Sequence, residues 1–403
     1  MKARRSFFVM ATRRANLALM TKILGSSLIK SINDWVLAHT KEKIRSDSMH
    51  RGKQSIELTN PVYIIGHASV VGSKEGEGPL GKLFDMVGSD DMFGAESWEE
   101  AESTLQKDAV YLAVKKAGLN VEDLDLIYAG DLLGQSIASA FGIKEYAIPL
   151  MGVFGACSTC GETLLLGSMA VAGGFANKVA CVTSSHFASA EKEFRYPLAY
   201  GSQRPLSATW TVTGSGAFVL ASQQKNGGET EDQCDQQMNA CKCGKPDAMI
   251  VGGTIGRVVD FGLKDSFNMG ACMAPAAADT IFNHFQDFQR TPEDYDKIIT
   301  GDLGNVGQKI LIDLLREKGF DISQKHMDCG MEIFNPDKQD THAGGSGCGC
   351  CASTLSALIL RNIKEGEWKR VLFVPTGAWF SKTSYNEGKA VPAIAHAVVI
   401  EQV

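Results

Sequence analysis

The segment Val121-Glu-Asp-Leu-Asp-Leu-Ile-Tyr-Ala-Gly-Asp-Leu132 is echoed later in the chain by Pro292-Glu-Asp-Tyr-Asp-Lys-Ile-Ile-Thr-Gly-Asp-Leu303. Asp131 and Asp302 hold equal positions in the two copies, which sets an offset of 171 residues (302 minus 131). Each copy follows a helical pattern and then runs into a short apolar strand and a Gly-Asp turn. The helices are expected over residues 101–118 and 276–289. Self-similarity of this kind predicts an internal duplication.

Three later pairs of elements keep the same order in both copies. A Gly- and Cys-containing turn opens a helix, one apolar strand follows, and a second apolar strand closes each half. The paired stretches are 154–160 with 344–348, 179–183 with 371–375, and 217–221 with 397–401. Strand, Gly-rich turn, helix and strand, twice over, predict an α/β fold of two βαβ-containing halves with buried sheets.

The duplication divides the chain into four parts. Residues 1–51 form a basic leader, residues 52–222 and 248–403 the two halves, and residues 223–247 a polar inserted loop. The leader holds 11 basic and three acidic residues, a net charge of +8 (11 minus 3), although the whole chain is −6. Three interpretations of it stay open: a dispensable leader upstream of a start at Met49, a surface anchor, or a targeting segment.

Composition narrows the function classes. With 40 basic against 46 acidic residues, the chain lacks the basic excess of a nucleic-acid-binding protein. No apolar run reaches about 18 residues, so no transmembrane helix is expected. Eleven cysteines without a secretory signal suit a reducing compartment, which favours the cytoplasm. Cys234, Cys241 and Cys243 lack a convincing fourth ligand nearby, so solvated loop cysteines are favoured over a zinc knuckle and no metal site is predicted. No cofactor is predicted either.

Cys157 is the first candidate functional residue. It precedes a predicted helix, where unpaired amides and the helix dipole favour a thiolate and can bind an anionic ligand. A small residue at a crowded turn is the structural alternative. The C-x-x-C formed with Cys160 also permits redox chemistry, but the sequence around it is not thioredoxin-like.

Four further candidates come from the local pattern. Asp302 is surrounded by glycines that allow close approach of the backbone. His186 ends a predicted buried strand, and His326 stands in a short polar motif, although a lone histidine is more often structural. Arg195 lies on an aromatic loop and has the guanidinium that suits a carboxylate ligand.

The turns around Cys157 and Ser346 carry a family resemblance. The duplicated layout resembles the thiolase and ketoacyl-synthase superfamily, and within it the stage V sporulation protein AD family, from about Met49 to Val403. The matching stretches include Ala129-Gly-Asp-Leu-Leu133, Phe154-Gly-Ala-Cys-Ser-Thr159, Thr211-Val-Thr-Gly-Ser-Gly-Ala217, Met273-Ala-Pro-Ala-Ala-Ala-Asp-Thr280 and Ala343-Gly-Gly-Ser-Gly-Cys348. The resemblance implies a duplicated, five-layered αβαβα fold with Cys157 at the nucleophile position.

The resemblance also implies what the site does. Condensing enzymes of the superfamily pair their cysteine with a His and an Asn, whereas Gly301 and Gly345 stand at those positions here. Condensation is therefore not expected. The family implies binding of dipicolinic acid, alone or as its calcium chelate, for uptake into the spore and release at germination. The expected ligand-binding residues are Cys157, Asp302, His186, Arg195, His326, Gly345 and Ser346.

Partners and the competing function follow from the same resemblance. The expected partners are other stage V channel proteins at the spore inner membrane, where this protein would lie peripherally on the cytoplasmic side. A homodimer is left open. The alternative function is an acyltransferase that uses Cys157 as an acyl-thioester nucleophile.

Overall fold

The computed structural model describes residues 48–194, 203–222 and 246–403. Most of the predicted leader, most of the inserted loop and the candidate Arg195 lie outside these ranges. From His50 onward the chain forms one compact unit. Its first strand, β1 (His50–Arg51), pairs with β2, so the end of the predicted leader already belongs to this unit.

The two halves contain corresponding elements in the same order, as the duplication predicts. The first half consists of β2 (Ser55–Val71), α4 (Trp98–Lys116), β4 (Leu126–Gly130), α5 (Ile137–Ile143), β5 (Leu150–Gly152), α6 (Thr159–Ala172), β6 (Lys178–Ser185), α7 (Phe187–Phe194) and β8 (Gly214–Ser222). The second half consists of β9 (Ala248–Thr254), α9 (Met269–Phe288), β10 (Lys297–Thr300), α10 (Gly304–Glu317), β11 (His326–Asp328), α13 (Cys348–Thr354), α14 (Leu360–Lys364), β13 (Arg370–Val374) and β16 (Ala397–Glu401).

Shorter elements fill the connections between these. In the first half they are α3 (Ser73–Gly76), β3 (Met86–Val87) and β7 (Trp210–Thr211). In the second they are α11 (Cys329–Ile333), α12 (Pro336–Gln339), β12 (Gly345–Ser346), β14 (Thr376–Ala378), α15 (Lys382–Asn386) and β15 (Ala393–Ala395).

The strands form a sheet path that is symmetric about its middle. The order is β11-β10-β13-β16-β9-β2-β8-β6-β4-β5, so each half contributes five strands in the same spatial order. Within each half, the strand inside the repeated segment is paired in parallel, β4 with β6 and β10 with β13. The halves meet where β2 and β9 pair antiparallel.

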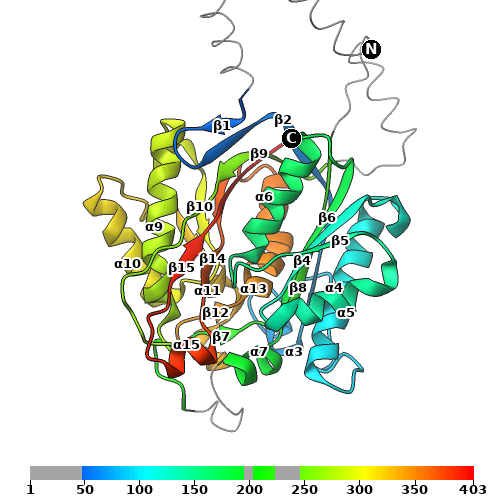
Figure 1. Cartoon of the computed structure of the whole chain (residues 1–403), viewed down its shortest axis with the longest axis horizontal. Coiled ribbons are helices and arrows are strands. Elements are labelled where there is room, and N and C mark those ends of the chain that lie inside the picture. The colour runs from blue at the N-terminus through cyan, green and yellow to red at the C-terminus, as the bar shows by residue number, and fades with distance from the viewer. Residues whose placement is uncertain (1–47, 195–202, 223–245) are drawn as a thin grey trace, which may run out of the picture. The chain divides into compact units, whose positions relative to one another are not determined.

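The helices divide into three layers around the two halves of the sheet. Figure 1 shows α6 and α13 in the middle, with β10 on one side and β4, β6 and β8 on the other. An added Cβ on Gly216 of β8 would lie 2.5 Å from the backbone of Ala352 in α13, and one on Gly253 of β9 would meet Leu165 of α6 at 2.7 Å. The middle helices therefore pack against both halves.

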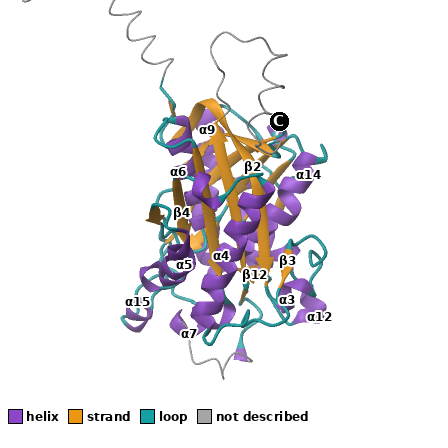
Figure 2. Ribbon diagram, turned by 90° about the vertical axis from the view of Figure 1, so that its right-hand side faces the viewer, coloured by secondary structure: helices purple, strands orange, loops and turns teal. Residues whose placement is uncertain are grey.

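The outer layers are helical as well. On the first half, α4 runs along β2, and Gly66 of β2 leaves room for the backbone of Ala113 (Figure 2). On the second half, His284 of α9 shares a hydrogen bond of 2.7 Å with Thr254 of β9. The structure thus confirms the predicted five-layered αβαβα fold.

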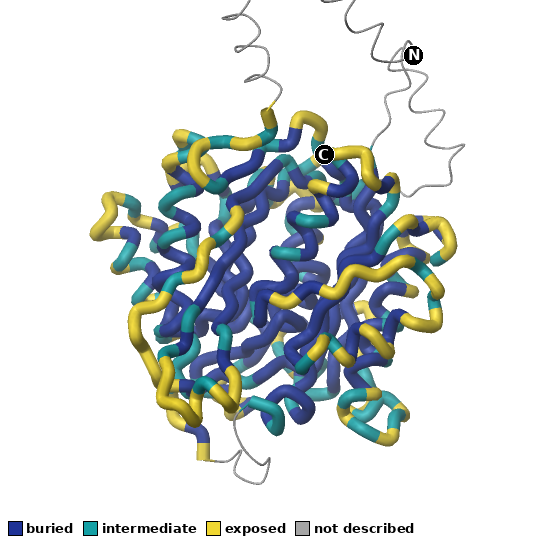
Figure 3. The backbone as a smooth tube through the Cα atoms, in the orientation of Figure 1, coloured by how far each residue is buried: buried dark blue, intermediate teal, exposed yellow. Residues whose placement is uncertain are grey.

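Strands that lie between helical layers are apolar on both faces. Along β8, every residue from Gly214 to Ala221 is buried, and the central strands are dark blue along most of their length in Figure 3. Continuous burial of this kind is what a sheet covered on both faces requires.

Two helices differ from the prediction. Helix α9 begins at Met269, seven residues before the predicted start, because Asn268 accepts a hydrogen bond from the amide of Ala271 and caps it. The helix predicted to end near Gly366 is interrupted by a π-helical segment, Leu355–Ile359, between α13 and α14. A π segment of this kind has no signal in the hydrophobic period.

Candidate functional site: a cavity between the two halves

A small cavity lies where the two halves meet at the start of α6. Its volume is about 50 Å³, which leaves room for a few water molecules. The polar groups around it come from both halves: Cys157, Glu191 and Thr211 from the first, Asp302 and Ser346 from the second. The remaining wall is largely apolar, with Leu132, Phe154, Phe194, Met269, Met273 and Phe380.

Cys157 lies on a tight turn before α6 and is half-buried. Ala156, directly before it, has φ of 51°, in the left-handed region. The amide of Ser158 donates to the carbonyl of Gly155 at 3.1 Å, and that of Thr159 to Ala156 at 3.2 Å. These two helix-start amides are therefore already used inside the turn, so the thiol of Cys157 is the group that the turn presents to the cavity.

Asp302 follows β10 and is buried at the cavity wall, 1% exposed. Its Oδ2 accepts a hydrogen bond of 2.9 Å from the amide of Gly347, and its Oδ1 accepts one of 2.7 Å from the hydroxyl of Thr376. Gly347 has φ of 101°, a conformation that favours glycine. Asp302 thus connects the end of β10 to the turn before α13 and to β14.

Burial raises the pKa of Asp302 to about 7. Hydrogen bonds from Gly347, Thr376 and Cys157 oppose this change because they favour the carboxylate. Near neutral pH the side chain is therefore partly protonated, and it can either accept or donate a hydrogen bond. This is the property of Asp302 that matters most for a ligand with carboxylate groups.

The two predicted histidines do not line the cavity. His186 Nε2 forms a hydrogen bond of 2.8 Å with the backbone carbonyl of Asp91, and His186 Nδ1 accepts a hydrogen bond from the amide of Ala188. His326 contacts Thr300 at 2.9 Å and Gln308 at 3.0 Å. Burial lowers the pKa of both rings, that of His326 to about 4, which keeps them neutral.

The glycines at the replaced His and Asn positions are closely packed. An added Cβ on Gly301 would lie 3.1 Å from the backbone of Pro375 and Thr376. One on Gly345 would lie 2.7 Å from Ile333, and Gly345 does not line the cavity although the next residue, Ser346, does. Neither position has room for a larger side chain without a shift of its neighbours.

Two residues of the site were not singled out from the sequence. Thr376 donates to Asp302, and it directly follows the second-half strand that the repeat identified. Glu191, 2% exposed, lines the cavity and accepts a hydrogen bond of 2.8 Å from Thr211. An acid next to the aromatic loop was the available signal for Glu191. Across the described ranges, no three His, Cys, Asp or Glu side chains are grouped to hold a metal ion.

Comparison with known proteins decides the family. Residues 52–401 match the family described as Stage V sporulation protein AD (SpoVAD). The chain belongs to this family. A relative in it, "Stage V sporulation protein AD" of Bacillus subtilis (strain 168), is 44% identical over 351 residues, which are 87% of this chain and 97% of the relative. The family predicted from the sequence motifs is thereby confirmed.

Solved structures outside the family share the fold. Human mitochondrial 3-ketoacyl-CoA thiolase in complex with CoA is 12% identical, with 86% of this chain and 99% of that chain covered and a TM-score of 0.50. Acetyl-CoA acetyltransferase from Syntrophomonas wolfei is 11% identical, with 85% and 100% covered and a TM-score of 0.51. At this identity the likeness shows that the AD-family chain has the thiolase fold and nothing further.

Among the described residues of this AD-family chain, none of the helices combines the length and the apolar character that crossing a membrane requires.

Proposed function

We propose that this sporulation protein binds dipicolinic acid, alone or as its calcium chelate, in the cavity between Cys157 and Asp302. The observation that carries the proposal is the state of Asp302, a buried acid with a pKa of about 7 at the wall of a largely apolar cavity. A protonated Asp302 donates a hydrogen bond to a ligand carboxylate, which an ionised aspartate cannot do. The apolar wall suits the flat ring.

The calcium chelate gives the second acid of the cavity a role. Glu191 and Asp302 both line it, and hard cations take carboxylate oxygens as ligands. In the chelate, the cation neutralises the two ligand carboxylates and offers its open coordination positions to Glu191. Dipicolinate without calcium would depend on the proton of Asp302 instead.

Entry of the ring requires the mouth of the cavity to widen. The volume of about 50 Å³ is smaller than that of typical ligand pockets, about 300 Å³ or more. Phe154 lines the cavity and is 47% exposed, so its ring can turn outward into solvent with little loss of packing. We propose that this rotation admits the ligand and that Phe154 then stacks on it.

Condensation has no support in the arrangement of the site. Gly301 and Gly345 provide no side-chain donor for an enolate or oxyanion, and Asp302 in its ionised form would repel one. Acyl transfer by Cys157 alone is the second candidate, since the thiol reaches the cavity from the start of α6. It would require a donor that labels Cys157 as a thioester.

The setting we propose is peripheral attachment at the cytoplasmic side of the spore inner membrane, with other stage V channel proteins as partners. There the protein would deliver dipicolinate during uptake and receive it at germination. The family membership supports this placement.

The test is calorimetric titration of dipicolinate, with and without calcium, into the protein from Met49 onward. We expect saturable binding that Cys157→Ala and Asp302→Ala both weaken. Asp131→Asn is the matched control, because Asp131 is the repeat counterpart of Asp302 and is also buried, but it accepts hydrogen bonds from Leu133 and from Ser139 of α5 within the first half.

Two outcomes oppose the proposal. If millimolar dipicolinate produces no heat, with or without calcium, the ligand is wrong. If an acyl-coenzyme A donor labels Cys157 in the wild type but not in Cys157→Ala, the acyltransferase candidate replaces it.

A further inference from the structure

A second hollow lies on a different part of the fold, against β2 and the π-helical segment. Its volume is about 470 Å³, and it shares no lining residue with the cavity at Cys157. Ile65, Leu83 and Ala357 form an apolar part of its wall, whereas the rest is polar. The size lies within the range of small-molecule sites, about 300 to 1,000 Å³.

Three cationic side chains from two helices surround this hollow. Lys116 comes from the end of α4, and Arg361 and Lys364 come from α14. Two carboxylates hold the lysines: Asp85 binds Lys116 at 2.5 Å, and Asp247 binds Lys364 at 2.6 Å. With a neutral histidine, the residues that line the hollow carry a net charge of +1 (three cations minus two anions). Arg361 is paired as well, because its Nε donates to Glu365, outside the lining, at 2.9 Å.

The rest of the protein holds the carboxylates of Asp85 and Asp247 in place beside the lysines. Asp85 Oδ2 accepts a hydrogen bond of 2.9 Å from the amide of Ser69 in β2, and this fixes Asp85 beside Lys116. Asp247 has a side-chain exposure of 12% and lies directly before β9. Carboxylates in such positions orient the lysines, and the lysines still have N–H groups to donate.

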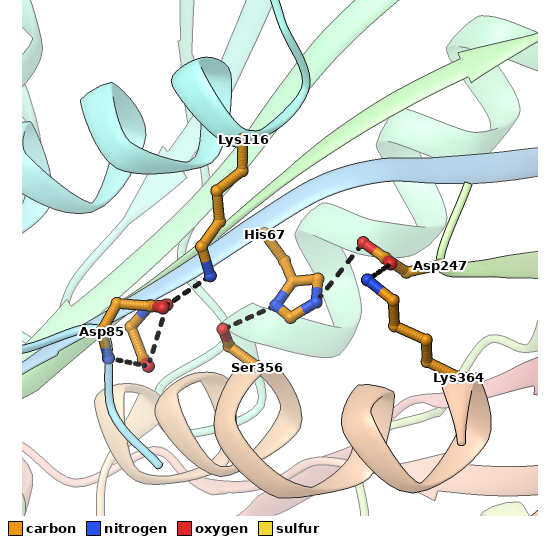
Figure 4. Close-up of polar contacts among 7 residues, drawn as sticks. His67, Asp85, Lys116, Asp247, Ser356 and Lys364 are labelled. Carbon is orange, nitrogen blue, oxygen red and sulfur yellow. Dashed lines mark hydrogen bonds and ion pairs between the residues drawn. The ribbon is translucent and has the colours of Figure 1, made fainter. Parts of the chain in front are cut away.

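His67 and Ser356 lie deeper in the hollow. Figure 4 shows His67 between the two ion pairs, with Ser356 below it on the π-helical segment. His67 Nδ1 and the hydroxyl of Ser356 share a hydrogen bond of 2.8 Å. Burial lowers the pKa of His67 to about 4, so the ring is neutral. Single-turn π segments are often found at functional sites.

Ser356, His67 and Asp247 do not form a catalytic triad. His67 Nε2 lies 3.6 Å from Asp247, which is too far for a hydrogen bond. Ser356 lies inside a helical run between α13 and α14, where backbone amides are engaged along the helix, so there is no pair of free donors for an oxyanion. The arrangement of cations points to binding instead.

We propose that this hollow is a second ligand site of the protein and that it binds a small organic phosphate monoester. Lys116, Lys364 and Arg361 meet the phosphate dianion, for which lysine point charges and an arginine fork are well suited. The hydroxyl of Ser356 donates to it, while the Ser356 oxygen accepts a hydrogen bond from the Nδ1–H tautomer of neutral His67. Ile65 and Leu83 contact the organic part of the ligand.

The test uses phenyl phosphate as the probe, titrated by calorimetry at low ionic strength, with phenol as the ligand without phosphate. We expect saturable binding of phenyl phosphate and none of phenol. The double variant Lys116→Gln/Lys364→Gln should lose at least about tenfold in affinity, because two cations of the phosphate contact are removed. Both lysines are partly exposed, at 44% and 64% of the side chain, so the fold should tolerate the change.

Lys107→Gln is the matched control, since Lys107 lies on the same helix, forms an ion pair with Glu145 and is outside this hollow. It should leave the affinity for phenyl phosphate unchanged.

The proposal is overturned if phenyl phosphate does not bind, or if Lys107→Gln weakens binding as much as the double variant does. Loss of dipicolinate rather than phenyl phosphate binding in the double variant would assign the hollow to dicarboxylates and refute the phosphate class. Asp302→Ala keeps the two sites distinguishable, because it should affect dipicolinate alone.

Discussion

The carboxylate of Asp302 accepts a hydrogen bond of 2.9 Å from the backbone amide of Gly347. The repeat counterpart Asp131 instead accepts from the amides of Leu133 and Ser139 within its own half. One position of the duplicated segment therefore fixes a turn in the first half, whereas in the second half it joins two turns and faces the cavity. The two copies of the segment therefore have the same fold, but the aspartate at this position makes different contacts in each.

The affinity for dipicolinate should depend on the protonation of Asp302. Its pKa of about 7 means that the proton needed for a ligand carboxylate is present below pH 7 and is lost above it. Between pH 6 and pH 8 we expect the affinity of the wild type for calcium-free dipicolinate to fall about tenfold. Asp302→Asn, which cannot ionise, should remove this slope. Titrations at pH 6, 7 and 8 measure it, and an unchanged slope in Asp302→Asn would contradict the role of the proton.

The repeated segment was sufficient to predict the corresponding strands of the two halves, because hydrophobic period and Gly-Asp turns are local signals. The five layers were predicted from the resemblance to the thiolase superfamily. The pair of segments around Asp131 and Asp302 became β4 and β10, each beside a parallel neighbour. Details that depend on contacts between distant segments were not predictable. The π turn at Leu355–Ile359 and the early start of α9 at Met269 are of this kind.

Part of the candidate site was predicted from the sequence. Cys157, Asp302 and Ser346 meet at one cavity, because the duplication placed the ends of corresponding elements together. His186 does not reach it, since its ring nitrogens bind Asp91 and Ala188. The contact of His186 with Asp91 joins segments 95 residues apart, and nothing in the local sequence indicates such a pairing.

Glu75 should make stability depend on pH. It is 1% exposed, its Oε1 accepts from the amide of Thr213 at 2.9 Å, and its Oε2 has no partner among the described residues. Burial raises its pKa from 4.5 to about 8, so the folded protein keeps a proton that the unfolded chain releases in this window. Its contribution to stability is therefore lost as the pH rises from 4.5 to 8.

Glu75→Gln should remove that loss. Relative to the wild type, the variant should gain about 3 kcal/mol in the free energy of unfolding between pH 5 and pH 8. Urea unfolding at the two pH values measures the difference, with the neighbouring exposed Glu77→Gln as the control. If the free energy of unfolding changed equally in Glu75→Gln and Glu77→Gln between pH 5 and pH 8, Glu75 would not titrate in this window.

Gly216 should be essential for packing between the first half and the middle layer. An added Cβ would lie 2.5 Å from the backbone of Ala352 in α13, and a helix backbone cannot move aside cheaply. We expect Gly216→Ala to lower the free energy of unfolding by about 3 kcal/mol. Gly152→Ala in β5 is the control, because an added Cβ there meets nothing within 4 Å. Equal urea midpoints for the two variants would contradict the tight contact.

Cys157 should react with iodoacetamide faster than the buried cysteines do. It is half-buried at the cavity, whereas Cys160 and Cys351 are buried, and burial raises the pKa of the Cys351 thiol well above its usual range. Peptide mass mapping over time should show modification of Cys157 first, and dipicolinate should slow it. Modification of Cys160 at the same rate, or no protection by the ligand, would count against the ligand lying beside the thiol.

The pairing of β2 with β9 bears on how the chain is made in the cell. Strand β2 is complete once Val71 has been synthesised, but its partner β9 begins only at Ala248. At about 5–20 residues per second, the interval of 177 residues (248 minus 71) lasts about 10 to 35 s. Until then β2 lacks one of its neighbours, and the face of β8 that packs on α13 stays uncovered longer, until Cys348 and the residues after it have been synthesised. A nascent first half on the ribosome therefore exposes, for that interval, an unpaired strand edge of the kind that folded proteins normally cover.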